Sequence, residues 1–460
     1  MVRAASSAAP DSVCMAEGRI HTNAAWNLLG LAAPLLLALF AVPKLIAALG
    51  AGAFGLLTLF WSLIGYFSLL DLGLGRALAQ VTAANRASGR EQAIPPAFWT
   101  SLLLMTLLGL LGAAVSLPFA GWFSALIVNG QPSLQADARA CLYLVALSAP
   151  VLTVSAALRG FLEAHQRFAP LSAVRIGLGA LTFVVPVLLL PYSHRVAAMV
   201  ASLVLARVLA LAVYGWLCFS LMPSLWGART VDWTAARALL RLGTWMTVSN
   251  VISPLMTYLD RFLIAAILSV SAVAFYATPF EAATKLLIIP GALTGVLFPA
   301  FSGALVSDRQ SATRLYRRSL LVLASVFLPL SLALAAFARP ALALWLGPDF
   351  AANTRHVLPI LALGIFANGV AGVPFSLIQA AGRPDLTARL HVAEAPLYFA
   401  ACWLLTKHYG IDGAALAWTG RVLVDAIALL LIARIWATRE HADAAPSVPA
   451  LARWRDGVST

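Results

Sequence analysis

The stretch PSLWGARTVDWTAARALLR, from Pro223 to Arg241, is the longest basic connection between the apolar runs of this chain. Runs of about 18 or more apolar residues, long enough to cross a bilayer as helices, recur on both sides of it, from Ala24 to Trp436. We expect about six such helices on each side. The stretch therefore predicts two helical halves joined by a basic linker.

The composition excludes a soluble globular protein. Of the 460 residues, 61% are hydrophobic and 11% are charged, whereas a soluble chain carries about 25% charged residues. The first apolar run, about 24–48, is too long for the hydrophobic region of a signal peptide and contains Lys44, so we interpret it as a retained span. The predicted fold class is an all-α polytopic membrane protein with about twelve transmembrane helices in two six-helix lobes.

The apolar runs also predict the organisation of the chain along its length. We expect an N-terminal tail at 1–22, an N-lobe with spans 1–6 at 23–221, a basic linker at 222–241, a C-lobe with spans 7–12 at 242–436 and a C-terminal tail at 437–460.

The positive charge of the chain, formally +13, follows the expected topology. Most of the 31 Lys and Arg residues lie in the tails and in the even-numbered connections between spans. By the positive-inside rule this places both termini in the cytoplasm. Since no basic patch with interleaved aromatic residues occurs, we expect no nucleic-acid partner.

Charged residues also occur inside the predicted spans, where each costs about 2.5–3.5 kcal/mol on insertion scales. Such residues face a partner or a water-filled cavity rather than lipid, so they are the candidates for function. The cations are Arg76, Arg175, Arg207, Arg261, Lys285 and Arg421, and the acids are Asp71, Asp260, Glu281, Glu394 and Asp425.

Two pairs of these charges share a helix face, since Glu281 and Lys285, like Arg421 and Asp425, are four residues apart. Each pair could be a structural salt bridge or part of a cavity. Asp260 and Arg261 are adjacent, hence about 100° apart around a helix, so at least one must reach another helix or a substrate.

The remaining embedded charges leave alternatives open. Arg207 lies near mid-span with no acid in its own helix, so it either lines a cavity or pairs with a neighbouring helix. Arg175 and Glu394 lie near the cytoplasmic interface, where long side chains can snorkel. Asp71 and Arg76 are five residues apart, and the glycines between them could bend the helix as part of a gate or form a structural cap.

The second span of each half is interrupted, by glycines in the first half and by Pro279, Pro290, Gly291, Gly295 and Pro299 in the second. Interrupted spans at matching positions indicate the binding site of a transporter. No nucleotide-binding loop, hydrolase elbow, zinc-protease motif or paired-cysteine site is present. We therefore expect no enzyme, no catalytic residues, no metal and no cofactor.

Three stretches resemble the Wzx-like polysaccharide biosynthesis proteins, the oligosaccharide flippases of the multidrug/oligosaccharidyl-lipid/polysaccharide (MOP) exporter superfamily. They are SLLDLGLGRALAQ (68–80), DRFLIAAILSVSAVAFYATPFEAATKLLIIPGALTGVLFPAFS (260–302) and QAAGRPDLTARLHVAEAPLYFAACWLLTKHYGIDGAALAWTGRVLVDAIAL (379–429). The second and third are the more specific, through Asp260–Arg261, Phe298–Pro299, Gly382–Asp385, and Arg421 with Asp425.

The resemblance implies a MATE-like (MOP) fold in the bacterial inner membrane, with a central cavity that opens alternately to either side. It implies that the cargo is an undecaprenyl-diphosphate-linked oligosaccharide, which is moved to the periplasmic leaflet for polysaccharide or O-antigen synthesis. The other partners that it implies are membrane lipids and a polymerase or ligase. Guanidinium groups suit a diphosphate, and the candidate cations for it are Arg76, Arg207, Arg261, Lys285 and Arg421. The candidates for proton or sodium coupling, or gating, are Asp71, Asp260, Glu281, Asp425 and Glu394.

Other functions remain open from the sequence. A drug/cation antiporter of the same superfamily should have a net acidic pocket, which the embedded charges slightly disfavour. A lipid II flippase usually has further spans. A membrane-embedded glycosyltransferase or ligase would need a catalytic carboxylate or a large periplasmic loop, and the longest outer connection, about 339–355, is short.

Overall fold

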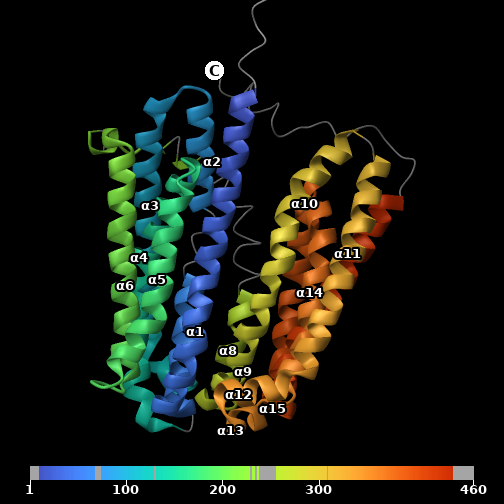
Figure 1. The fold of residues 1–460 in the computed structure, drawn as a ribbon. Coiled ribbons are helices and arrows are strands. Elements are labelled where there is room, and N and C mark those ends of the chain that lie inside the picture. The colour runs from blue at the N-terminus through green and yellow to red at the C-terminus, as the bar shows by residue number, and fades with distance from the viewer. Residues whose placement is uncertain are drawn as a thin grey trace, which may run out of the picture.

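The computed structural model describes residues 10–67, 74–128, 131–227, 230–233, 236–237, 255–307 and 309–438. Asp71, the stretch 238–254 and the two ends of the chain lie outside these residues. The regular structure of the described residues is helical throughout (Figure 1), so the predicted all-α fold class is confirmed.

The helices of the first half are α1 (Pro10–Phe67), α2 (Leu74–Ala87), α3 (Ile94–Ile127), α4 (Gln135–Ala164), α5 (Phe168–Leu189) and α6 (Val196–Leu221). Those of the second half are α8 (Asp260–Ile267), α9 (Val270–Thr284), α10 (Ile288–Ser307), α11 (Arg309–Ala336), α12 (Ala338–Leu346), α13 (Pro348–Asn353), α14 (Val357–Ala380) and α15 (Pro384–Thr438). We call the two sets the N-lobe and the C-lobe. Short 3-10 turns connect several of them, at Glu91–Ala93, Pro132–Leu134, Pro223–Trp226 and Lys285–Leu287.

Two of these helices are too long for one crossing and turn at a glycine. A straight helix of 55 residues, the length of α15, would extend about 80 Å, well beyond a bilayer. Gly410 interrupts α15 with a positive φ of 61°, and Gly50 interrupts α1 with a φ of 73°. The described residues contain nine helical segments long and apolar enough to cross a membrane, and the turns at Gly50 and Gly410 lie within two of them.

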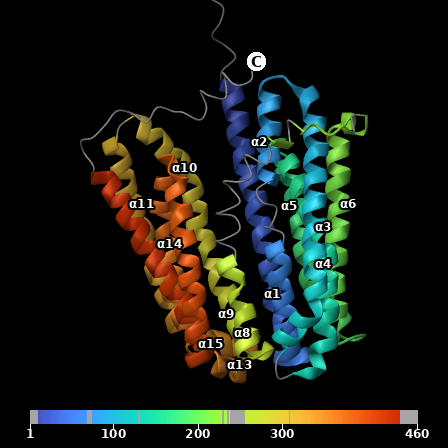
Figure 2. The same ribbon diagram turned by 180° about the vertical axis from the view of Figure 1, so that it is seen from behind.

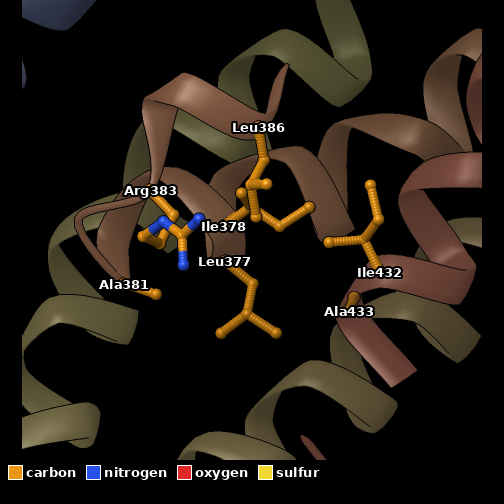
Figure 3. A pocket seen from close by; sticks show the side chains of 7 residues that line it. All are labelled: Leu377, Ile378, Ala381, Arg383, Leu386, Ile432 and Ala433. Carbon is orange, nitrogen blue, oxygen red and sulfur yellow. The ribbon is translucent and has the colours of Figure 1, made fainter. Parts of the chain in front are cut away.

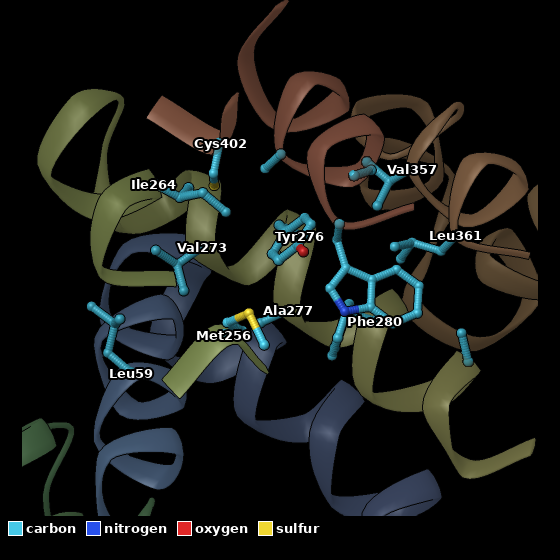
Figure 4. Packing of buried hydrophobic residues seen from close by; sticks show 14 of the residues in the cluster. Leu59, Met256, Ile264, Val273, Tyr276, Ala277, Phe280, Val357, Leu361 and Cys402 are labelled. Atoms are coloured by element: carbon cyan, nitrogen blue, oxygen red, sulfur yellow. The ribbon is translucent and has the colours of Figure 1, made fainter. Parts of the chain in front are cut away.

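The two lobes lie far apart at one end of the molecule and approach each other at the other end (Figures 1 and 2). At the wide end, where α2, α10 and α11 reach, the N-lobe has a hydrophobic core of its own that includes Leu78, Phe98 and Phe161. The larger core is continuous through both lobes, and Leu59 of α1 belongs to it together with Ile264, Val273 and Tyr276 of the C-lobe (Figure 4). The lobes are therefore joined through apolar packing near the narrow end.

Backbone contacts at glycine reinforce this packing, as expected where lipid replaces water and close van der Waals contact drives helix association. A Cβ at Gly55 of α1 would collide with the carbonyl oxygen of Val270 in α9, and one at Gly160 would collide with that of Gly75 in α2. The first contact joins the lobes, and the second packs α2 against α4. Gly75 thus lies at a close helix contact.

Two polar contacts between the lobes also lie at the narrow end. Gln131, between α3 and α4, donates its side-chain amide to the Ser271 hydroxyl near the start of α9, at 2.9 Å. Trp345 of α12 donates its indole N–H to the carbonyl oxygen of Leu39 in α1, at 2.7 Å. Together with the Gly55 contact, these bonds close the narrow end.

Candidate functional site

Arg261 lies at the junction of the two lobes and is 1% exposed. One end of its guanidinium donates to the Ser62 hydroxyl of α1, and Nη2 donates to Glu281 Oε1 of α9 at 2.7 Å. The Ser62 hydroxyl in turn donates to the carbonyl oxygen of Thr58 at 2.9 Å. Arg261 therefore connects the N-lobe with the C-lobe through one side chain.

Aromatic rings hold the guanidinium in place, and the neighbouring acid binds the backbone of Arg261. The Arg261 Cζ atom lies 5.2 Å from the ring centroid of Tyr258 and 5.4 Å from that of Phe280, within the range of cation–π contacts. Asp260 accepts the backbone N–H of Arg261 at 2.7 Å and the Tyr276 hydroxyl at 2.7 Å. Asp260 and Arg261 thus contact different residues of α9, and Arg261 also reaches α1, so a reach to another helix occurs as their spacing predicts.

Glu281 and Lys285 form the ion pair that their four-residue spacing allows, with Lys285 Nζ 3.1 Å from Glu281 Oε2. Because Oε1 binds Arg261, one carboxylate joins two cations. The side chains of Glu281 and Lys285 are 41% and 45% exposed, so this end of the cluster is accessible while Arg261 is covered. Lys285 begins the 3-10 turn between α9 and α10, just before Pro290, where the sequence predicts an interruption.

A second polar cluster lies within the C-lobe, between the two arms of α15. His391 Nε2 lies 3.6 Å from Asp425 Oδ1, across the turn at Gly410. Glu394 is buried, and neither of its carboxylate oxygens has a hydrogen-bond partner among the described residues. A buried acid without a hydrogen-bond partner is suited to binding a proton or a small cation, because either would remove the cost of an uncompensated charge.

Arg421 does not pair with Asp425 in the described residues, although the two share a helix face. It donates to the Met256 sulfur at 3.8 Å, and its Cζ atom lies 5.7 Å from the ring centroid of Tyr398. Asp425 instead faces His391. The aromatic and sulfur contacts of Arg421 satisfy a cation only weakly, so an anion could improve its environment.

The other predicted cations lie apart from these clusters. Arg207 donates to the carbonyl oxygen of Leu203 in its own helix, at 3.1 Å, and α6 lies on the side of the N-lobe away from the C-lobe (Figures 1 and 2). Arg76 is exposed on α2, and Arg175 is half-buried in α5. Asp71 lies outside the described residues, so its proposed proximity to Arg76 stays a prediction.

The sequence does not predict several residues of the two clusters. Ser62 and Tyr276 are ordinary small or aromatic members of apolar runs, and nothing in their pattern marks them. Tyr398 is equally inconspicuous. His391 could have been found, because it is a titratable residue three positions before Glu394 and therefore on the same helix face.

A small pocket at the end of α14 is mostly apolar. Its lining residues are Leu377, Ile378, Ala381, Arg383, Leu386, Ile432 and Ala433 (Figure 3). Arg383 is the charged residue of this lining, and it already binds Asp385 at 2.9 Å. The pocket thus offers an anionic headgroup fewer available positive charges than the Arg261 cluster does.

Two helical lobes with a charged junction are typical of membrane transporters, and comparisons with known proteins give the family of the chain. A family model described as polysaccharide biosynthesis protein matches residues 20–305. The protein named "Putative O-antigen transporter" from Shigella flexneri is 32% identical over 411 residues, which cover 89% of this chain and 96% of that protein. The chain therefore belongs to the polysaccharide biosynthesis protein family, as its motifs predict.

Solved structures give the same fold. The inward-facing conformation of a multidrug resistance MATE family transporter of the MOP superfamily has a TM-score of 0.76 at 14% identity, with 89% of this chain and 98% of that chain covered. An outward-facing conformation of such a transporter has a TM-score of 0.64 at 15% identity, covering 89% and 93%. The chain thus has the multi-pass fold of these membrane transporters, and the relative from Shigella flexneri is likewise named as a transporter and not as an enzyme.

Proposed function

We propose that this transporter flips an undecaprenyl-diphosphate-linked oligosaccharide from the cytoplasmic to the periplasmic leaflet of the bacterial inner membrane. The observation that carries the proposal is the cluster of Arg261 and Lys285 at the lobe junction, in a chain 32% identical to a protein named as an O-antigen transporter. A diphosphate is an anion that guanidinium and ammonium groups bind through charge-assisted hydrogen bonds. The sugars would lie between the lobes and the prenyl chain in the surrounding lipid.

The direction rests on the distribution of charge and on the shape of the molecule. Basic residues such as Arg86, Arg90 and Arg167 lie in connections that we assign to the cytoplasm, together with both termini. With this orientation the lobes are apart on the cytoplasmic side, where a lipid-linked precursor would enter. The higher similarity to an inward-facing than to an outward-facing structure supports this assignment.

The transport cycle would alternate between this state and one that is open at the narrow end. During this cycle, the two lobes, at 23–221 and 242–436, would move against each other as rigid units. The linker at 222–241 would join them. Proton or sodium binding at the Glu394–Asp425–His391 cluster would supply the energy, since Glu394 is buried and its carboxylate has no hydrogen-bond partner among the described residues. The delivered lipid would then pass to a polymerase or ligase.

Translocation in proteoliposomes tests the proposal. The purified protein is reconstituted with a fluorescent undecaprenyl-diphosphate oligosaccharide, and the accessibility of the headgroup to a membrane-impermeant quencher is followed over time. Efflux of a cationic dye is measured on the same preparation, with protein-free vesicles as the control. Headgroup translocation without dye efflux supports the flippase, and dye efflux without translocation would mean a drug/cation antiporter instead.

A further inference from the structure

The carboxylate of Glu281 occupies the place where an anionic headgroup would meet Arg261 and Lys285. Its two oxygens lie 2.7 Å from Arg261 Nη2 and 3.1 Å from Lys285 Nζ. A phosphate group accepts the same charge-assisted bonds from the same kinds of donors. One carboxylate thus makes the contacts that one phosphate would make.

Exposure shows which partner can leave. Arg261 is 1% exposed, whereas the Glu281 side chain is 41% exposed and that of Lys285 is 45% exposed. The Arg261 guanidinium is also fixed by Ser62 and by the Tyr258 and Phe280 rings. A headgroup can therefore reach Nη2 only after Glu281 moves aside, and Arg261 keeps its position when this happens.

The electrostatics make the exchange reversible. A buried guanidinium that loses a partner carries a large cost unless another anion replaces it. Glu281 leaves at little cost when a phosphate arrives, and it returns when the phosphate departs. Asp260 cannot take this role, because its oxygens already accept the Arg261 backbone N–H and the Tyr276 hydroxyl.

We propose that Glu281 is an internal substitute for the headgroup phosphate, which covers Arg261 in the empty transporter and is displaced when the lipid diphosphate binds. This inference rests on the proposed function and adds a residue that sets headgroup affinity and release. Only an anion that binds both cations more tightly than Glu281 does would displace this acid. The site would therefore favour a diphosphate over neutral or singly charged lipid headgroups. On departure of the headgroup, the acid would compete for the same cations and accelerate release.

Binding of fluorescent undecaprenyl diphosphate to the full-length protein in lipid nanodiscs tests the inference. Glu281→Gln keeps the shape of the side chain, so Arg261 retains an acceptor while the competing charge is removed. We expect Glu281→Gln to bind the probe roughly tenfold more tightly than the unmodified protein, as for the loss of one repulsive charge at a binding site. Arg261→Gln should bind it roughly tenfold more weakly or worse.

Two further variants serve as controls. Asp412→Asn also removes one carboxylate from an ion pair, with His356 at 2.9 Å, but outside the cluster, so the affinity should not change. Glu281→Asp keeps the charge on a shorter side chain that cannot reach both cations equally well, so its affinity should lie between those of the unmodified protein and Glu281→Gln. This variant decides the matter if Glu281→Gln does not fold, as judged by gel filtration and thermal unfolding.

The rate of translocation separates this role from a structural one. Glu281→Gln should flip the headgroup more slowly at saturating lipid, with a lower KM, because release loses the returning acid. Binding that is equal or weaker in Glu281→Gln, alongside weaker binding in Arg261→Gln, overturns the inference and leaves the proposed function in place. Absence of binding by the unmodified protein, or an Arg261→Gln variant that binds equally well, overturns the headgroup site itself and the inference with it.

Discussion

Adding one methyl group at Gly55 should weaken the contact that closes the narrow end. A Cβ there would collide with the carbonyl oxygen of Val270, and Val270 begins α9, so relief of the collision requires the two lobes to shift. Overpacking of this kind costs about 1–3 kcal/mol. Since about 1.4 kcal/mol changes an equilibrium tenfold, the closed state of this end should lose roughly five- to 150-fold in relative population.

Gly121→Ala is the matched control, because a Cβ at Gly121 in α3 would meet no atom within 4 Å. Both changes replace a helical glycine and gain up to about 1 kcal/mol of helix propensity, so this effect cancels in the comparison. Spin labels at Leu126 of α3 and Leu344 of α12, both exposed, would report the separation of the lobes by pulsed electron resonance in nanodiscs. Gly55→Ala should show longer distances, and a distribution identical to that of Gly121→Ala would refute the reasoning.

Three further predictions concern substitutions in the two polar clusters and in the connection between α4 and α5. Arg261→Ala should reduce headgroup translocation at least tenfold, as expected for loss of a charged contact, whereas Arg207→Ala, on the far side of the N-lobe, should reduce it far less; equal losses would argue against the junction site. Glu394→Gln should remove the response of transport to an imposed proton or sodium gradient, and an unchanged response to both would place coupling elsewhere. Burial lowers the pKa of His165 below its ordinary 6.5, so its neutral form stabilises the fold above pH 6.5 and this contribution is lost as the pH falls below that value. Thermal unfolding of His165→Gln should therefore depend less on pH below 6.5 than that of the unmodified protein.

The helical lobes are predictable from the sequence because the bilayer imposes one rule on every span. A polar backbone in lipid must be satisfied within a helix, so length and hydropathy define the spans. The turns at Gly50 and Gly410 follow from the same reasoning, since a glycine at positive φ allows a sharp reversal that other residues resist. The packing of the lobes at the narrow end is another matter, because it depends on which glycine meets which carbonyl across elements more than 200 residues apart.

The candidate site was predictable in its charges and not in its pairings. The cost of a buried charge marks Asp260, Arg261 and Glu281 in any sequence of this kind. Helix geometry also predicts that Asp260 and Arg261 reach different partners. It does not predict that Glu281 would bind Arg261 as well as Lys285, because that bond depends on how α8 packs against α9.

The position of Arg261 gives a physical route from headgroup binding to movement of the lobes. A ligand shifts a conformational equilibrium only by as much as its affinity differs between the two states. Arg207 touches its own helix, so an anion there would bind both states alike. Arg261 donates to Ser62 of one lobe and to Glu281 of the other, and its surroundings must change whenever the lobes separate at this level. An anion bound to Arg261 therefore has different contacts in the two states, which is the condition for driving transport from one side of the membrane to the other.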